Sequence, residues 1–204
     1  YHRFYPQYLK RSSLLLPIAE AAGLNIALSM FNNYVTGAEY AKISFKSVRH
    51  NLDTGFVWDD DVFVVNQFGH PFHGSIYYNA ARSTGFSYWE SIPFAFGGSL
   101  MWEMFMETDP PQTNDILQTT LGGTMVGEMT YRLSSLILDE STSGPNRIFR
   151  ETVSTILNPA RGFNRLISGD MFRRTPTNVN DVFPVTSRLN VGYAGINPSS
   201  SVNF

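Results

Sequence analysis

The spacing of apolar and polar residues predicts a mainly α protein. In six stretches apolar positions recur three and four residues apart, and capping residues, glycine or proline bound each stretch. These stretches are residues 12–31, 39–50, 71–84, 87–108, 114–139 and 147–157. Near the C-terminus the period becomes two, since Val185, Leu189, Val191 and Tyr193 share one parity, which is typical of a β-strand. A lone strand is not stable in water, so we expect it to pair with a partner or with a barrel missing from these residues.

The pattern divides the chain into four parts. Residues 12–158 form the predicted compact helical bundle. An aromatic and basic arm, residues 1–11, precedes the bundle, and a basic segment, residues 159–184, which we expect to be irregular, follows it. The strand and tail occupy residues 185–204. Because no signal pattern opens the chain, we expect a processed or partial polypeptide.

The first predicted helix has the length of a membrane span, about 20 residues. Pro17, Glu20 and Asn25 interrupt its apolar run, so we expect a buried or interfacial helix. The arm before it suits a membrane interface or a docking segment, although a frayed terminus explains the same residues equally well.

Small residues mark the faces on which we expect close helix packing. Gly123 and Gly127 lie four apart beside an apolar stripe that includes Leu121 and Met125. Glycines at this spacing let a second backbone approach closely, in a bilayer or in a tight bundle. Glycine costs about 1 kcal/mol in a helix interior, so close packing is expected to offset that cost. We therefore expect a bundle with tightly packed Gly, Ala and Ser faces.

Composition narrows the classes of function. Charged residues make up 16% of the chain, against roughly 25% in typical soluble domains, and aromatic residues make up 14%. The formal net charge of −2 argues against broad attraction to nucleic acid. The absence of cysteine excludes disulfides, thiolate zinc sites and cysteine nucleophiles. The chain is expected to bury much of its surface against itself, a partner or lipid.

Ionisable residues in three predicted helices are expected to meet inside the bundle. Glu103 and Glu107 are four apart on an otherwise apolar helix, as are Glu128 and Arg132 on the next. An unpaired buried charge costs several kcal/mol, so these groups need partners. The expected buried network comprises His70, His73, Tyr77, Arg82, Glu103, Glu107, Asp115, Glu128 and Arg132.

The same residues admit a structural and a chemical interpretation. Structurally, Glu103 and Glu107 form salt bridges with Arg82 and Arg132, Glu128 and Arg132 form an intrahelical pair, and the histidines are core or helix-start residues. Chemically, Glu103 or Glu107 is a general base, with His73 as its catalytic partner. A third possibility is a metal held by His70, His73 and Glu103, although a His-x-x-His pair alone is a weak zinc signal. No nucleophile elbow, phosphate-binding loop or dinucleotide fingerprint is present, and the pattern indicates no particular cofactor.

Several segments resemble an uncharacterised bacterial family of unknown function. The main ones are NQFGHPFHGS at 66–75, YY at 77–78, AAR at 80–82, GSLMWE at 98–103, GG at 122–123, GE at 127–128, YR at 131–132 and NPARGFNR at 158–165. The resemblance covers about residues 60–140, and the run at 158–165 resembles a further segment of the family. It implies an origin in the envelope of Gram-negative bacteria of the Bacteroides–Flavobacterium type, with a helical region followed by outer-membrane-like strands.

Three functions are compatible with the sequence. The first is a non-catalytic structural or docking module on the periplasmic side of the outer membrane, with an outer-membrane barrel or an envelope protein complex as partner. The alternative is an envelope hydrolase that acts on lipid or glycan through a His/carboxylate site. Binding of a lipid or a small apolar ligand is the third, and it rests only on the aromatic residues and the seven methionines.

Overall fold

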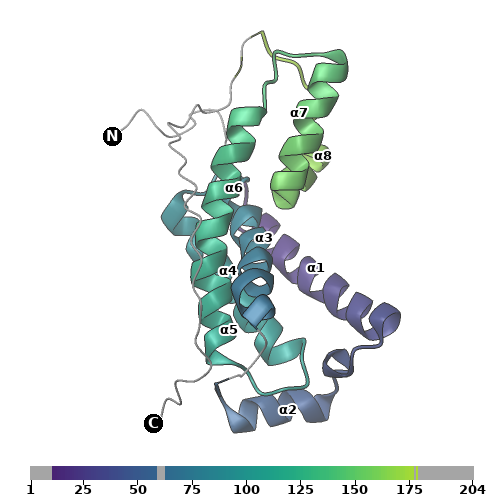
Figure 1. The fold of residues 1–204 in the computed structure, drawn as a ribbon, viewed down its shortest axis with the longest axis vertical. Coiled ribbons are helices and arrows are strands. Elements are labelled where there is room, and N and C mark those ends of the chain that lie inside the picture. Colours follow the sequence, from purple (N-terminus) through teal and green to yellow (C-terminus); the bar gives the residue numbers. More distant parts are fainter. Residues whose placement is uncertain (1–10, 59–62, 177, 179–204) are drawn as a thin grey trace, which may run out of the picture.

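The computed structural model describes residues 11–58, 63–176 and 178, and this part of the chain is mainly helical, as the sequence predicts (Figure 1). The α-helices are α1 (Leu15–Phe31), α2 (Phe45–Thr54), α3 (His70–Arg82), α4 (Tyr88–Phe105), α5 (Thr113–Leu117), α6 (Gly123–Ile137), α7 (Gly144–Leu157) and α8 (Pro159–Ser168). Wider π turns extend α1 over Asn32–Thr36, precede α3 over Val65–Gly69 and join α5 to α6 over Gln118–Gly122. A 3-10 turn occupies Glu39–Ala41.

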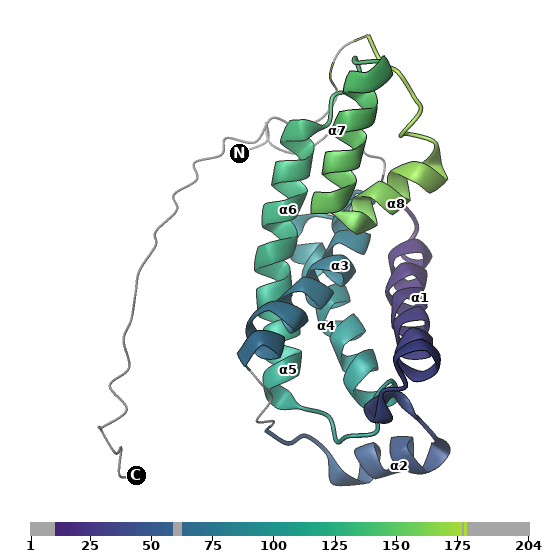
Figure 2. The same cartoon turned by 45° about the vertical axis from the view of Figure 1, so that its right-hand side comes forward.

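Helix α3 is the centre of the molecule, because it contacts α1, α4, α6 and α8. Figures 1 and 2 show α1 on one side of this centre and α2 across the lower end. Helices α7 and α8 contact each other, and α7 packs against α6 beside its upper part. Residues from four helices therefore surround the polar positions of α3.

Three predicted helix boundaries arise from local features of the chain. The Ser87 side chain accepts a hydrogen bond from the backbone of Glu90, and the Glu90 carboxylate accepts one from the backbone of Ser87. This capping box fixes the start of α4. Gly85, with a φ of 95°, supplies the left-handed turn that separates α3 from α4. Pro71 lies in the first turn of α3, where its missing N–H costs nothing.

The structure corrects two predicted elements. The helix expected over residues 39–50 is interrupted, because Ser44 and Ser47 form a capping box that starts α2 only at Phe45. The basic segment expected to be irregular, residues 159–184, begins instead with α8. Asn158 caps that helix by accepting from the backbone of Arg161, and Pro159 occupies its first turn. Proline thus ends one helix and begins the next.

Helix α1 is not a buried helix, contrary to that part of the sequence expectation. Its buried residues are Pro17, Ala21, Asn25 and Ser29, which lie four apart on one stripe. With its π turn, the stretch Leu15–Thr36 is long and apolar enough to cross a membrane. Only 17% of the residues in its most apolar 18-residue segment are buried. Most of the arm at residues 1–11, and the predicted strand at residues 185–204, lie outside the described residues.

The interior of the described bundle contains many small and polar residues beside a few large aromatic ones. Fully buried side chains include Tyr77, Tyr78 and Tyr131, and also Glu103 and Asp115. Many Leu, Ile, Met and Phe side chains are exposed on the outside. Hydrogen bonds and close backbone approach therefore hold the centre together to an unusual degree.

Candidate functional site

Tyr77 joins three helices in the interior. Its hydroxyl donates to Asn25 Oδ1 on α1 and lies 2.7 Å from Nε2 of His73, one turn earlier on α3. The Asn25 amide donates to the carbonyl of Gly98 on α4 over 3.0 Å. Because the Tyr77 proton is given to Asn25, we assign the bond from His73 as donated by Nε2–H. The Trp102 ring meets the His73 ring edge-on at 5.0 Å between centroids. We call Asn25, His73 and Tyr77 the Tyr77 cluster.

Glu128 on α6 is the centre of a second set of contacts. It accepts from the Tyr78 hydroxyl over 2.7 Å and from Nε of Arg82 over 2.9 Å. Its other oxygen accepts from Nε of Arg132, one turn later on the same helix, over 2.8 Å. The Arg82 side chain is 7% exposed and that of Arg132 is 45% exposed. We call these four residues the Glu128 cluster, and in it the two arginines are not equivalent.

The carboxylates near the end of α4 are bonded to neutral donors. Glu103, which is 2% exposed, accepts from the backbone N–H of Gln112 over 3.0 Å. Glu107 accepts from the indole Nε1 of Trp102 over 2.6 Å. The Glu107 backbone carbonyl also accepts from Asn51 of α2 over 3.0 Å. These bonds attach the loops at the lower end of the bundle to α4.

His70, at the start of α3, faces α5. Its Nε2 atom lies 3.4 Å from Oδ1 of Asp115, a carboxylate that is almost fully buried. Asn114 also donates to that oxygen, over 2.8 Å. This pair lies one helical turn before His73 on α3.

The residues of the predicted network thus fall into four sets of contacts, and Trp102, which packs on His73 and donates to Glu107, links two of them. The two arginines offered as partners of Glu103 and Glu107 both bind Glu128. Within the described part of the chain, no three His, Asp or Glu residues are arranged to hold a metal ion. His70, His73 and Glu103 are therefore not brought together as a three-ligand site.

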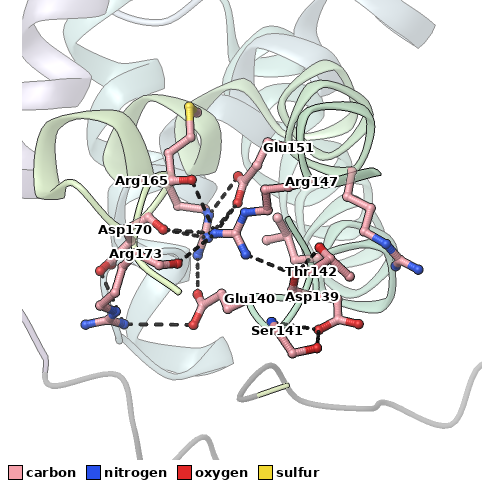
Figure 3. Close-up of polar contacts among 12 residues, drawn as sticks. Asp139, Glu140, Ser141, Thr142, Arg147, Glu151, Arg165, Asp170 and Arg173 are labelled. Carbon is pink, nitrogen blue, oxygen red and sulfur yellow. Dashed lines mark hydrogen bonds and ion pairs between the residues drawn. The ribbon is translucent and has the colours of Figure 1, made fainter. Parts of the chain in front are cut away.

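Sequence reasoning missed a further charged cluster, which Figure 3 shows between the end of α6, α7 and α8. Arg165 of α8 binds Glu151 of α7 through two bonds of 2.8 and 3.0 Å. It also binds Glu140 over 2.8 Å. Arg147 pairs with Glu151 over 2.8 Å, so two guanidiniums face two carboxylates. We call Glu140, Arg147, Glu151 and Arg165 the upper ion cluster.

The upper ion cluster is buried and electrically balanced. The side chains of Glu140 and Glu151 are 3% and 6% exposed. Burial by itself lowers the pKa of Arg165, but the bonds to Glu151 and Glu140 outweigh it and raise that pKa above its ordinary value. A partial signal for this cluster was present, because Arg147 and Glu151 are four apart on a predicted helix. The prediction of an irregular segment at 159–184 hid the rest.

Arg161 connects the upper part of the molecule to the Glu128 cluster. Its Nη1 atom donates to the carbonyl of Tyr131 over 3.2 Å and to the hydroxyls of Ser134 and Ser135. Burial lowers the pKa of Arg161 from its high ordinary value. The guanidiniums of Arg82 and Arg161 lie 4.1 and 4.9 Å from the centre of the Tyr131 ring, a distance at which cation–π attraction acts.

Two cavities in the described residues lie away from the candidate catalytic residues. One, of about 640 Å³, is lined by residues of α7 and of the loop after α8, including Arg147, Ile148 and Phe172. The other, of about 340 Å³, lies between α1 and α4 and has an apolar lining that includes Ile18 and Phe94. Neither is lined by His70, His73, Glu103 or Glu107. The predicted acid–base residues therefore face other side chains and backbone groups rather than these cavities.

The fold and these contacts define a helical bundle that is held together by buried, mutually bonded polar side chains. The chain belongs to an uncharacterised family, described as Domain of unknown function (DUF3943), whose sequence model matches residues 55–160. This range contains α3 to α7 with the Glu128 cluster, and it leaves out α1. No curated protein and no solved structure matches the chain.

Proposed function

We propose that the chain is a non-catalytic structural or docking module of the cell envelope. The observation that carries the proposal is that Glu103, Glu107 and Glu128 are each bonded to groups of neighbouring helices or loops, and that His73 is bonded to Tyr77 of its own helix. A general base needs hydrogen-bond reach to a substrate proton. Side chains already engaged with the fold better suit a role in holding helices together.

The proposed setting is the periplasmic side of the outer membrane in Gram-negative bacteria. The low content of charged residues, 16%, supports a chain with an extensive apolar contact surface. An outer-membrane barrel or an envelope protein complex is the proposed partner. The alternating residues Val185, Leu189, Val191 and Tyr193 are the proposed first strand of outer-membrane-like strands, since such alternation suits a strand with two different faces.

Paired measurements of unfolding and turnover test this role. Glu103→Gln and His73→Ala are expected to lower the midpoint of thermal unfolding, because each removes a bonded buried group. The exposed Glu39→Gln is the matched control, since its charge lies on the surface in an exposed ion pair. Purified full chain is expected to show no hydrolysis of phospholipid or glycan substrates, with or without added divalent metal.

The alternative, an envelope hydrolase, makes the opposite prediction. Turnover that disappears in Glu103→Gln while the unfolding midpoint stays unchanged would overturn the structural proposal. Fractionation of cells that produce the chain tests its setting. Recovery of the chain in the cytosolic fraction would contradict the envelope assignment.

A further inference from the structure

The polarity of α5 and α6 is inverted relative to a helix of a water-soluble protein. The outward positions Leu117, Leu121, Met125 and Met129 lie four apart and are 47–71% exposed. The inward positions are small or polar and include Thr120, Thr124 and Glu128. A surface helix of a soluble protein turns its apolar stripe to the core and its polar face to water. This helix does the reverse.

Helix α1 repeats the inversion. Its inward stripe is Pro17, Ala21, Asn25 and Ser29, whereas its outward residues include Leu15, Ile18, Ile26, Met30 and Phe31. Helices α1 and α6 both pack on α3, and Figures 1 and 2 show them on different sides of it. The apolar surface therefore extends over more than one side of the bundle.

Helix α4 and the turn before α3 complete the apolar surface. On α4 the outward residues include Phe96 and Phe105, and the buried ones include Ser91, Ser99 and Glu103. Phe68 and Phe72 are exposed before and within α3. A docking patch for a single partner would occupy one face of the bundle. The exposed apolar residues instead lie on four helical segments.

Ionised side chains border this surface at two levels. At the upper level Arg11 and Glu90 form an exposed ion pair at 2.7 Å, and Arg132 is also exposed. At the lower level the exposed charges are Glu39, Lys42, Lys46, Arg49, Asp53 and Asp109. Between the levels, residues 21–36, 63–82, 91–105 and 113–131 are all described and carry no exposed Asp, Glu, Lys or Arg. We call the outward surface of these four ranges the apolar band.

The longest helical stretches within the apolar band have about the length needed to cross a bilayer core. Residues 63–82 and 113–131 are continuous helix of 20 and 19 residues, which at 1.5 Å per residue gives about 30 and 28 Å. The hydrocarbon layer of a bilayer is about 30 Å thick. Exposed aromatic residues lie at both borders, with Trp89 at the upper one and Tyr34 and Trp58 at the lower one, as in the aromatic belts of membrane proteins.

The way the helices associate also fits a lipid surrounding. Between helices in lipid there is no hydrophobic driving force, so small residues and hydrogen bonds hold them together. A Cβ atom on Gly74 would lie 1.8 Å from the backbone oxygen of Thr119, so α3 and α6 approach as closely as glycine permits. The bonds of Asn25, Tyr77 and Glu128 join α1, α3, α4 and α6.

We propose that the apolar band is embedded in the hydrocarbon layer of a phospholipid bilayer. The polar clusters of α3, α4 and α6 then lie inside the bundle, and the charged ends lie in the two interfaces. The apolar cavity of about 340 Å³ between α1 and α4 opens within the band and accepts lipid acyl chain. Helices α7 and α8, with the upper ion cluster, lie above the band. The inference deepens the proposed function by naming lipid as the contact of the module, and it places the band within the membrane rather than on its periplasmic surface. It rests on that function only for the envelope setting.

The absence of cysteine makes a direct test simple, because a single introduced cysteine carries the only label. The full chain is synthesised in the presence of phosphatidylcholine–phosphatidylglycerol vesicles, washed with urea and floated. Met125→Cys and Ile26→Cys report on the band, and Lys46→Cys and Ser143→Cys report on regions outside it. All four positions are exposed, so the substitutions leave the interior unchanged. Each variant is labelled with an environment-sensitive fluorophore.

The inference predicts that the chain floats with the vesicles after the urea wash. Bromine atoms attached to the middle of the lipid acyl chains quench the labels at residues 26 and 125. Aqueous iodide quenches these two labels several-fold less than it quenches the labels at residues 46 and 143. Equal quenching of all four labels by iodide would overturn it. Shielding of residues 26 and 125 only in a lipid-free complex with a protein would overturn it in favour of a protein partner.

The same preparation separates this inference from the proposed function. A chain that inserts and also hydrolyses the vesicle lipids keeps the inference and overturns the non-catalytic role. A chain that neither inserts nor turns over lipid overturns the inference alone.

Discussion

Gly74 of α3 and Gly123 of α6 lie directly against each other. A Cβ atom on Gly123 would lie 2.5 Å from the Cα atom of Gly74, and one on Gly74 would lie 1.8 Å from the backbone oxygen of Thr119. Backbone atoms, not flexible side chains, fill the space on both sides. The two helices therefore meet at a distance that only glycine allows, and the positions of Tyr77, Tyr78 and Glu128 depend on that distance.

Gly123→Ala is expected to lower the free energy of unfolding by about 1–3 kcal/mol, the usual range for overpacking. The added methyl group must push α3 and α6 apart, which outweighs the better helix propensity of alanine. Chemical denaturation of the full chain, in lipid or detergent, measures the change. Gly97→Ala is the matched control, because that helical glycine is exposed and has nothing within 4 Å of its Cβ position. Equal stability of the two variants would contradict the close approach.

Glu128 and its two arginines provide a test of burial. Arg82→Gln is expected to cost about 3–5 kcal/mol, because it breaks a buried pair. Arg132→Gln is expected to cost less than about 1 kcal/mol, because its 45% exposed side chain makes the same type of bond at the surface. The free energies of unfolding of the two variants, measured under the same conditions, show which arginine contributes more to stability. Similar losses would show that Arg82 is not the main partner of the carboxylate.

The sequence predicts which charged residues point into the bundle better than it predicts which of them pair with each other. Glu103, Glu107 and Glu128 are charges on apolar helices, so their inward direction follows from periodicity. Which arginine each one meets depends on where α3 crosses α4 and α6, and side-chain spacing within one helix does not contain that information. The sequence paired Arg82 with the α4 carboxylates, whereas the structure pairs it with Glu128.

Proline caused the main error in the sequence interpretation. Pro159 after Asn158 correctly indicates the end of a helix, and the same residues also start α8. Treating residues 159–184 as irregular removed the helical spacing of Arg161 and Arg165, and with it the upper ion cluster. The π turn over residues 118–122 was also invisible, because widening a helix by one residue leaves its apolar pattern almost intact.

Arg165→Gln tests the upper ion cluster. The substitution leaves the buried carboxylates of Glu140 and Glu151 without their central guanidinium, so we expect a loss of about 3–5 kcal/mol in the free energy of unfolding. Arg173→Gln is the control, because the Arg173 side chain is 60% exposed and its contact with Glu140 is long, at 4.0 Å. This substitution is expected to lower the free energy of unfolding by less than about 1 kcal/mol. Denaturation curves of both variants give the comparison. A loss in Arg165→Gln no larger than in the control would mean that the cluster does not hold α8 on α7.

Asp139, between α6 and α7, gives a pH-dependent prediction. Its side chain accepts from the Ser141 hydroxyl over 2.6 Å and from the Ser141 backbone over 3.0 Å. The Ser141 hydroxyl is the main cause that lowers the pKa of this carboxyl below its ordinary value. A carboxyl whose folded pKa lies below its unfolded value stabilises the fold above the unfolded pKa, and this contribution disappears as the pH falls through the folded pKa.

Ser141→Ala is therefore expected to be less stable than the natural chain at neutral pH, by under about 1 kcal/mol because the site is partly exposed to solvent. The difference is expected to shrink below about pH 4, near the unfolded pKa of aspartate. Unfolding measured from pH 7 to pH 3 checks this. Thr142→Ala is the control, since its hydroxyl donates to the Asp139 backbone carbonyl, which does not titrate. A difference for Ser141→Ala that stays constant with pH would exclude the ionised carboxylate as the bonded form.

Met125→Lys tests the apolar band with a charge. Met125 is 71% exposed, so in water a lysine there is expected to leave stability almost unchanged. In the middle of a bilayer the same charge costs about 2.5–3.5 kcal/mol. The fraction of newly synthesised full chain that floats with phospholipid vesicles is therefore expected to fall sharply. Leu52→Lys, on the charged lower end and 57% exposed, changes an apolar residue to the same charge and is expected to insert as the natural chain does. Because the two substitutions are equivalent in water, equal flotation of both variants can only mean that Met125 does not face lipid.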